Sequence, residues 1–159
     1  MKPEERVQKA LARLGMAGSS VEYESSTGTA AEAARAVGCE LGQIVKTLFF
    51  LADGRPTVAL VAGDRLADTA RLAQILGVGR KKLKMGSPAE VLRHTGYAVG
   101  GVAPVGPAHA CDVVLDESLR RFKRVWAAAG SDHAVFAVDT AELAAAVNGQ
   151  WAVVTREAE

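Results

Sequence analysis

The chain has 159 residues, of which 49% are hydrophobic and 23% are charged, and its formal net charge at pH 7 is +1. This length suits one domain with a buried core, and no stretch approaches the roughly 20 apolar residues that span a bilayer. The near-neutral balance excludes the whole-protein positive field of a dedicated duplex-DNA binder. We therefore expect a single domain over residues 1–159, with neither DNA nor a membrane as a partner.

The N-terminus is charged and lacks the apolar run and small-residue cleavage site of a signal peptide, which indicates a cytoplasmic protein. Cys39 and Cys111 are far apart in the sequence, and a disulfide is not expected in that compartment. His94, His109 and His133 show no metal-ligand spacing. We expect no metal and no other cofactor.

Helical and strand-like segments follow one another in the first half of the chain. Apolar residues recur at helical spacing from Pro3 to Leu14, and Thr29 with Glu32 forms a capping box that opens a second helix. Asp53-Gly54 is a hairpin turn signal between two strand-like runs. The sequence predicts helices over 3–14 and 30–37, a helical turn over 40–43, and strands over 21–24, 45–52 and 56–62.

In the second half, Gly77 ends a helical pattern that begins at Leu66, and Ser87 to Glu90 combines an N-cap, a proline at the first helical position and a capping glutamate. The sequence predicts helices over 66–76, 88–95 and 140–148, and strands over 82–85, 113–115, 125–128, 134–138 and 151–155. Strands and helices do not alternate strictly, and the hairpin requires antiparallel pairing. We expect an α+β fold whose mixed, largely antiparallel sheet is curled or closed into a barrel and flanked by helices.

The segment from Gly96 to Pro107 combines several glycines and prolines with too many apolar residues for an exposed linker. Glycines let a ligand approach the backbone and let successive N–H groups converge on an oxygen, while proline restricts the loop. The segment is therefore either a binding loop or a tight crossover between two strands. The residue pattern alone favours the crossover.

Two isolated polar side chains also have two interpretations each. Lys46 interrupts an apolar strand, so it is either an edge-strand lysine with its head in water or a positive charge at the mouth of a pocket. His133 follows the turn Gly130 to Asp132, and its ring either hydrogen-bonds locally or points into a cleft.

Two basic clusters carry enough charge to neutralise a few phosphates. They are Arg80 to Lys84, which has four cations, and Arg120 to Arg124, which also has four. The residues alone favour two solvated faces.

Three blocks of sequence are similar, in order and spacing, to the YbaK/ProX superfamily of aminoacyl-tRNA deacylases: Thr29 to Ala34, Val45 to Leu48, and Gly96 to Gly106. Val125 to Gly130 and Glu142-Leu143 resemble the family's closing elements, so the resemblance covers nearly the whole chain. It implies hydrolysis of the ester of a mischarged aminoacyl-tRNA, as in the free-standing bacterial deacylases and in the editing domain of many bacterial prolyl-tRNA synthetases.

The resemblance also implies roles for single residues. Lys46 is the counterpart of the family's essential lysine, and Gly101, Pro104 and Gly106 are the fixed positions of its Gly-x-x-Pro-x-Gly motif. Backbone N–H groups near Gly101 are expected to bind the ester carbonyl, and Lys46 to hold a phosphate of the terminal adenosine. The resemblance supplies no obvious general base, and His133 is the candidate to test for that role. The expected substrate-binding residues are Thr47, Gly100, Val102, Pro104, Gly106, Ala128 and Gly130.

The attacking group is expected to be water or the substrate's own ribose hydroxyl or side chain. The amino acid removed stays open among Cys, Ala, Ser and Thr, including those carried by tRNA(Pro), with prolyl-tRNA synthetase as a further partner to test. Two other functions compete with hydrolysis. One is a non-catalytic module of the same fold that binds tRNA ends or a synthetase, and the other is a regulatory or cell-envelope-associated protein.

Overall fold

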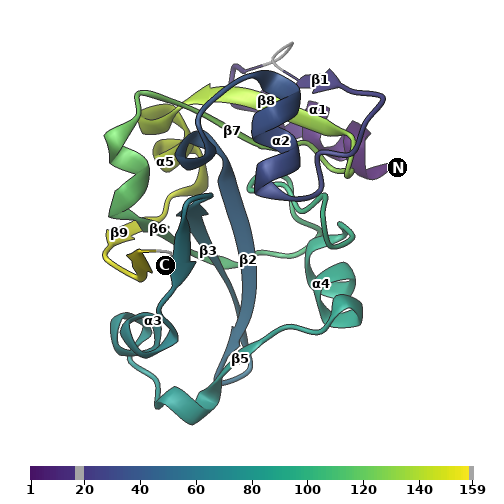
Figure 1. Ribbon diagram of the computed structural model, residues 1–159. Coiled ribbons are helices and arrows are strands. Elements are labelled where there is room, and N and C mark those ends of the chain that lie inside the picture. Colours follow the sequence, from purple (N-terminus) through teal and green to yellow (C-terminus); the bar gives the residue numbers. More distant parts are fainter. Residues whose placement is uncertain (17–19, 158–159) are drawn as a thin grey trace.

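A five-stranded mixed sheet forms the centre of the molecule (Figure 1). The structure, a computed structural model, describes residues 1–16 and 20–157. The sheet has the order β5-β2-β3-β6-β9, in which β2 pairs antiparallel with both β3 and β5, whereas β3 with β6 and β6 with β9 are parallel pairs. Its strands are β2 (Val45–Ala52), β3 (Arg55–Ala62), β5 (Leu83–Met85), β6 (Asp112–Asp116) and β9 (Gln150–Ala152).

The remaining strands form two smaller antiparallel sheets. One has the order β1-β8-β7 and the other pairs β10 with β4. The expected curled sheet or barrel is wrong, because the described strands divide among three sheets, none of which closes on itself. The α+β class and the mixed pairing are confirmed. These strands are β1 (Ser20–Glu22), β4 (Arg65–Ala67), β7 (Arg124–Ala128), β8 (Ala134–Asp139) and β10 (Thr155–Glu157).

Most of the helices begin where local signals predict. The Thr29 side chain accepts a hydrogen bond from the Glu32 N–H, and the Ser87 side chain accepts one from the Glu90 N–H, so both predicted capping boxes are confirmed. Within residues 1–16 and 20–157, no helix has the length and apolarity needed to cross a membrane. The helices are α1 (Pro3–Arg13), α2 (Ala30–Val37), α3 (Thr69–Leu76), α4 (Pro88–Thr95) and α5 (Thr140–Val147), with short 3₁₀ turns η1 (Leu41–Gln43), η2 (Arg80–Lys82) and η3 (Glu117–Arg121).

Two predicted segments differ from the structure. The helix expected from Leu66 begins at Thr69, after Asp68 caps it, because residues 65–67 pair with β10 instead. The strand expected over 151–155 is two strands, β9 and β10, separated where the Val154 N–H donates to the Asp116 carboxylate at 2.8 Å. In both places a long-range partner outweighs the local pattern.

The two faces of β2 pack against different layers, because successive side chains of a strand point to opposite sides. Val45 and Phe49 face the larger core, which also contains residues of α1, α4, α5 and β8. Phe50 faces a second core with Leu72 of α3. In Figure 1, β2 runs the length of the molecule between α3 and α4. This division of faces decides which side chains of β2 can share a site.

Candidate functional site

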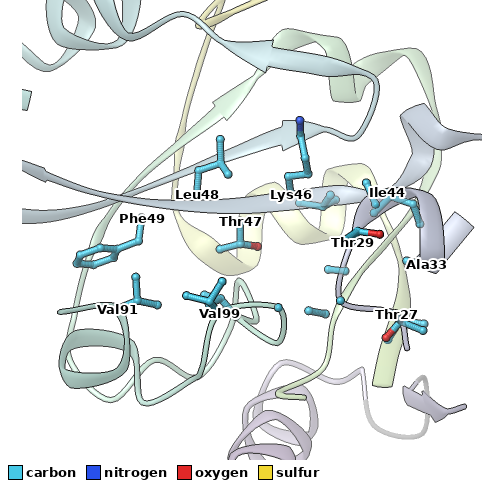
Figure 2. A pocket seen from close by; sticks show the side chains of 18 of the residues that line it. Thr27, Thr29, Ala33, Ile44, Lys46, Thr47, Leu48, Phe49, Val91 and Val99 are labelled. Carbon is cyan, nitrogen blue, oxygen red and sulfur yellow. The ribbon is translucent and has the colours of Figure 1, made fainter. Parts of the chain in front are cut away.

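A cavity of about 510 Å³ opens along the Val45 and Phe49 face of β2. Its walls come from α2 and the loop before it, from β2, from the start of α4, from the glycine-rich segment and from β7. The volume lies within the range of pockets that enclose a small-molecule ligand. Most of the wall is apolar, and Ala33, Ile44, Phe49, Val91 and Val99 are among its residues (Figure 2).

Three threonines supply the polar groups of this pocket. Thr29 is the N-cap of α2, so its hydroxyl is already engaged. The hydroxyls of Thr27 and Thr47 are buried and have no hydrogen-bond partner among the described residues. A buried polar group without a partner costs about 1–3 kcal/mol, so water or a bound ligand must supply the missing partners of these two groups.

Lys46 contributes to the pocket wall, but its amine lies on the other side of β2 (Figure 2). The Nζ atom donates to the Arg65 carbonyl oxygen at 2.5 Å. Burial lowers the pKa of Lys46, and the nearby Asp64 carboxylate partly offsets this effect. The amine therefore does not lie at the mouth of this pocket, because strand alternation places Lys46 and Thr47 on opposite faces.

The glycine-rich segment is held in place by close contacts within the protein. The Gly101 N–H donates to the Ala98 carbonyl at 3.0 Å, and a Cβ at Gly101 would lie 2.6 Å from the Ser131 Cα. The Tyr97 hydroxyl contacts the Val105 and Gly106 carbonyl oxygens at 2.7 and 2.8 Å. These contacts fit the crossover interpretation, in which glycine allows two backbones to approach closely.

The predicted substrate-binding residues fall into two groups. Thr47, Gly100, Val102 and Ala128 line the large pocket. Pro104 and Gly106 line a different cavity of about 200 Å³, and Gly130 packs against the backbone of Pro3.

His133 lies outside the pocket lining but close to its rim. Its ring Nδ1 is 2.6 Å from the Asp132 carboxylate, and the Asp132 Cβ is within 3.2 Å of a Cβ built at Gly28, a pocket residue. The Asp132 carbonyl accepts a hydrogen bond from the Thr27 N–H at 2.6 Å. The turn that carries His133 is therefore hydrogen-bonded to the loop that carries Thr27. His133 itself makes a local hydrogen bond, which is one of the two interpretations given for it.

Several pocket residues were not predicted from the sequence. Phe49 lies two residues after Thr47 on the same face of β2, so strand alternation alone could have added it to the site. Thr27 lies in a run of turn-forming residues that indicated only a loop. Trp126 and Val99 had no local signal, because only the tertiary fold brings them to the cavity.

Residues 24–146 match the family model of the aminoacyl-tRNA editing domain. The chain belongs to the aminoacyl-tRNA editing domain family. This confirms the predicted resemblance to the YbaK/ProX deacylases. The uncharacterized protein YwhH of Bacillus subtilis is 40% identical over 123 residues, which are 77% of this chain and 76% of YwhH.

Similarity also extends to a synthetase and to a solved structure. A proline–tRNA ligase of Nitratidesulfovibrio vulgaris is 37% identical over 92 residues, or 58% of this chain but only 16% of the ligase, so the match covers one segment of a much longer enzyme. The crystal structure of a candidate trans-editing enzyme for prolyl-tRNA synthetase has a TM-score of 0.90 and 39% identity, covering 98% of this chain and 99% of that one.

Proposed function

We propose that this editing domain hydrolyses the ester of a mischarged aminoacyl-tRNA, acting as a separate protein, with the aminoacyl-adenosine end bound in the 510 Å³ pocket. The observation that carries the proposal is this pocket, with its apolar walls and two unpartnered hydroxyls, in a domain of the editing family. An aminoacyl ester is already activated, so the protein must mainly position it and stabilise the oxyanion. A nucleophilic triad is therefore not required for this reaction.

Backbone N–H groups of the glycine-rich segment are the proposed oxyanion donors. Gly101 does not serve directly, because its N–H is bonded to Ala98. Gly100 and Val102 line the pocket, and their N–H groups have no partner in the described part of the chain. In the proposed reaction, water attacks the ester carbon and gives its proton to a base, and the ribose oxygen leaves with a proton. His133, oriented by Asp132, is the proposed base.

The first basic cluster is the proposed contact for the tRNA backbone. Arg80, Lys81, Lys82 and Lys84 are exposed and make no ion pair within the described residues, and Met85, the next residue, lines the pocket. Two of the four cations of the second cluster form ion pairs within the chain. Arg120 pairs with Glu117 and lies over the Trp151 ring, while Arg121 pairs with Asp64 at 2.7 Å. Unpaired cations beside the pocket favour the first cluster.

Charge reversal tests this assignment. In the variant Lys84→Glu, tRNA affinity should fall and the salt dependence of binding should become shallower by about one unit of slope per lost phosphate contact. Lys123→Glu is the matched control, because Lys123 is an exposed, unpaired lysine of the second cluster. Equal losses in the two proteins, measured by filter binding of uncharged tRNA, would refute the assignment.

Hydrolysis itself is tested with tRNA(Pro) charged separately with Cys, Ala, Ser and Thr, by following loss of the ester. We expect at least one ester to be cleaved, and His133→Ala to slow cleavage by about 100-fold or more if its ring is the base. Lys46→Ala should affect cleavage only indirectly, because the amine donates to the Arg65 carbonyl on the face of β2 away from the pocket.

One observation favours a second function. The Lys46 amine and the Gly101 N–H both have partners within the protein, as a non-catalytic module that binds tRNA ends would allow. If all four esters survive under conditions in which an active deacylase cleaves them, while tRNA still binds, the non-catalytic module is the correct function.

A further inference from the structure

The pocket has two chemically different ends (Figure 2). Phe49 and Val91 lie at the end next to α4, whereas Thr27, Ala33 and Ile44 lie at the opposite end, next to α2. Thr47 lies between them. A bound aminoacyl-adenosine can therefore lie in the pocket in two opposite orientations, with its amino acid at one end or at the other.

The unpaired cations of the first basic cluster, Arg80 to Lys84, determine the orientation, provided that the pocket binds a tRNA terminus as proposed above. Met85 and Gly86 line the pocket near α4 and directly follow the cations that end at Lys84. A tRNA strand that leaves the pocket at that end places its phosphates next to these cations. The amino acid then points the other way, into the α2 end.

The α2 end offers a small side chain an apolar wall and one hydroxyl. Ala33, Ile44 and Val135 are 3%, 5% and 3% exposed and pack together there. Thr27 is only 5% exposed, and its hydroxyl has no partner among residues 1–16 and 20–157. A 120° rotation about χ1 can bring the threonine hydroxyl to the staggered position that the methyl group occupies, so this hydroxyl can turn toward a ligand without backbone movement.

The lining of the cavity also excludes a charged side chain from this end. Among the described residues that line the cavity, only Lys46 is ionisable, and its amine lies on the opposite face of β2. Burying an unpaired charge is far more costly than burying a neutral hydroxyl. The substrate side chain that fits this end is therefore small, uncharged and able to form a hydrogen bond.

We infer that Thr27 is a specificity-determining residue, and that the α2 end selects the side chain of serine over that of alanine. Serine differs from alanine by the hydroxyl that would satisfy Thr27. A site built to hydrogen-bond a substrate hydroxyl discriminates strongly against an analogue that lacks it, because the buried partner is then left unpaired.

The test uses 3′-seryl-amino and 3′-alanyl-amino derivatives of 3′-deoxyadenosine, whose amide link resists hydrolysis, and measures their binding by calorimetry. Wild-type protein should bind the seryl compound about tenfold or more tightly than the alanyl compound. Thr27→Val removes the hydroxyl while keeping the side-chain shape, and should reduce this ratio to about one. Thr27→Ser keeps the hydroxyl and should retain the preference.

Thr47→Val is the matched control, because it removes the other unpartnered hydroxyl at the middle of the pocket. It should weaken both compounds alike and leave their ratio unchanged. A wild-type ratio near one, or a ratio that survives Thr27→Val, overturns the inference. Selective binding without cleavage of any aminoacyl-tRNA supports the inference while refuting the proposed hydrolysis, so the two failures are distinguishable.

Discussion

Replacing Tyr97 by phenylalanine tests whether the glycine-rich segment is held by hydrogen bonds to one buried side chain. Tyr97 is fully buried, and its hydroxyl lies 2.7 and 2.8 Å from the Val105 and Gly106 carbonyl oxygens. Tyr97→Phe keeps the ring, including its contact with the Arg6 guanidinium at 5.4 Å, but removes the donor. Loss of this bond should lower the free energy of unfolding by about 1–2 kcal/mol at pH 8.

The Tyr97 hydroxyl should also make the free energy of unfolding depend on pH. Burial raises the pKa of Tyr97 from its ordinary value of 10.0 to about 12, and the Arg6 guanidinium opposes this shift. A pKa raised on folding gives stability that is complete below the unfolded-state pKa and is lost as the pH rises toward the folded-state pKa. The advantage of wild type over Tyr97→Phe should therefore shrink by about 2 kcal/mol between pH 9 and pH 12.

Urea unfolding followed by tryptophan fluorescence, repeated from pH 8 to pH 11.5, measures both effects. Tyr23→Phe is the control, because Tyr23 is only partly buried and its hydroxyl makes no hydrogen bond in the described part of the chain. It should change neither the stability nor its pH profile. Equal stability of wild type and Tyr97→Phe at pH 8, with parallel curves up to pH 11.5, would show that the hydroxyl does not hold the segment.

Two further predictions concern backbone and carboxylate contacts. Gly101→Ala should lower the free energy of unfolding by about 1–3 kcal/mol in thermal melts, because its Cβ would lie 2.6 to 2.8 Å from Ser131 backbone atoms; a melt unchanged from wild type would contradict this packing. Burial alone would raise the pKa of Asp116, but hydrogen bonds from Ser118, Val154 and Thr155 outweigh it and hold the pKa below its ordinary value of 3.8. Its stabilisation is therefore present above about pH 4 and lost as the pH falls further, so Asp116→Asn should be less stable than wild type at pH 7 and should lose less stability on acidification.

Local signals in the sequence predicted the elements that short-range chemistry determines. The Asp53-Gly54 turn gives the hairpin its full register, from Val45 opposite Ala62 to Ala52 opposite Arg55. Asp53 and Gly54 both adopt positive φ, 50° and 82°, as a two-residue hairpin turn of this kind requires.

Long-range pairing explains what the sequence analysis could not predict. The parallel additions of β6 and β9 to the central sheet join segments that are distant in the chain, and no local pattern specifies them. The choice between a barrel and separate sheets depends on these pairings. The same reason applies to Leu66 and Ala67, whose helical spacing was outweighed by pairing with β10.

The predicted site contained an inconsistency that strand geometry reveals. It assigned the neighbouring side chains of Lys46 and Thr47 to one cleft, although adjacent residues in a strand point to opposite faces. The structure keeps Thr47 in the pocket and turns the Lys46 amine toward Arg65. An effect of Lys46 on activity would therefore act through the position of β2, or would require the amine to leave its carbonyl partner.

Gly101 can influence the substrate without touching it. Its close approach to the Ser131 backbone positions the next residue, Asp132, whose carbonyl oxygen accepts the Thr27 N–H at 2.6 Å. A side chain at position 101 would push this turn away and move Thr27 with it. Gly101→Ala should therefore weaken the discrimination between seryl and alanyl compounds as well as the fold, even though the Gly101 N–H is bonded to Ala98. A direct oxyanion role would instead slow cleavage of every ester equally and leave that discrimination intact.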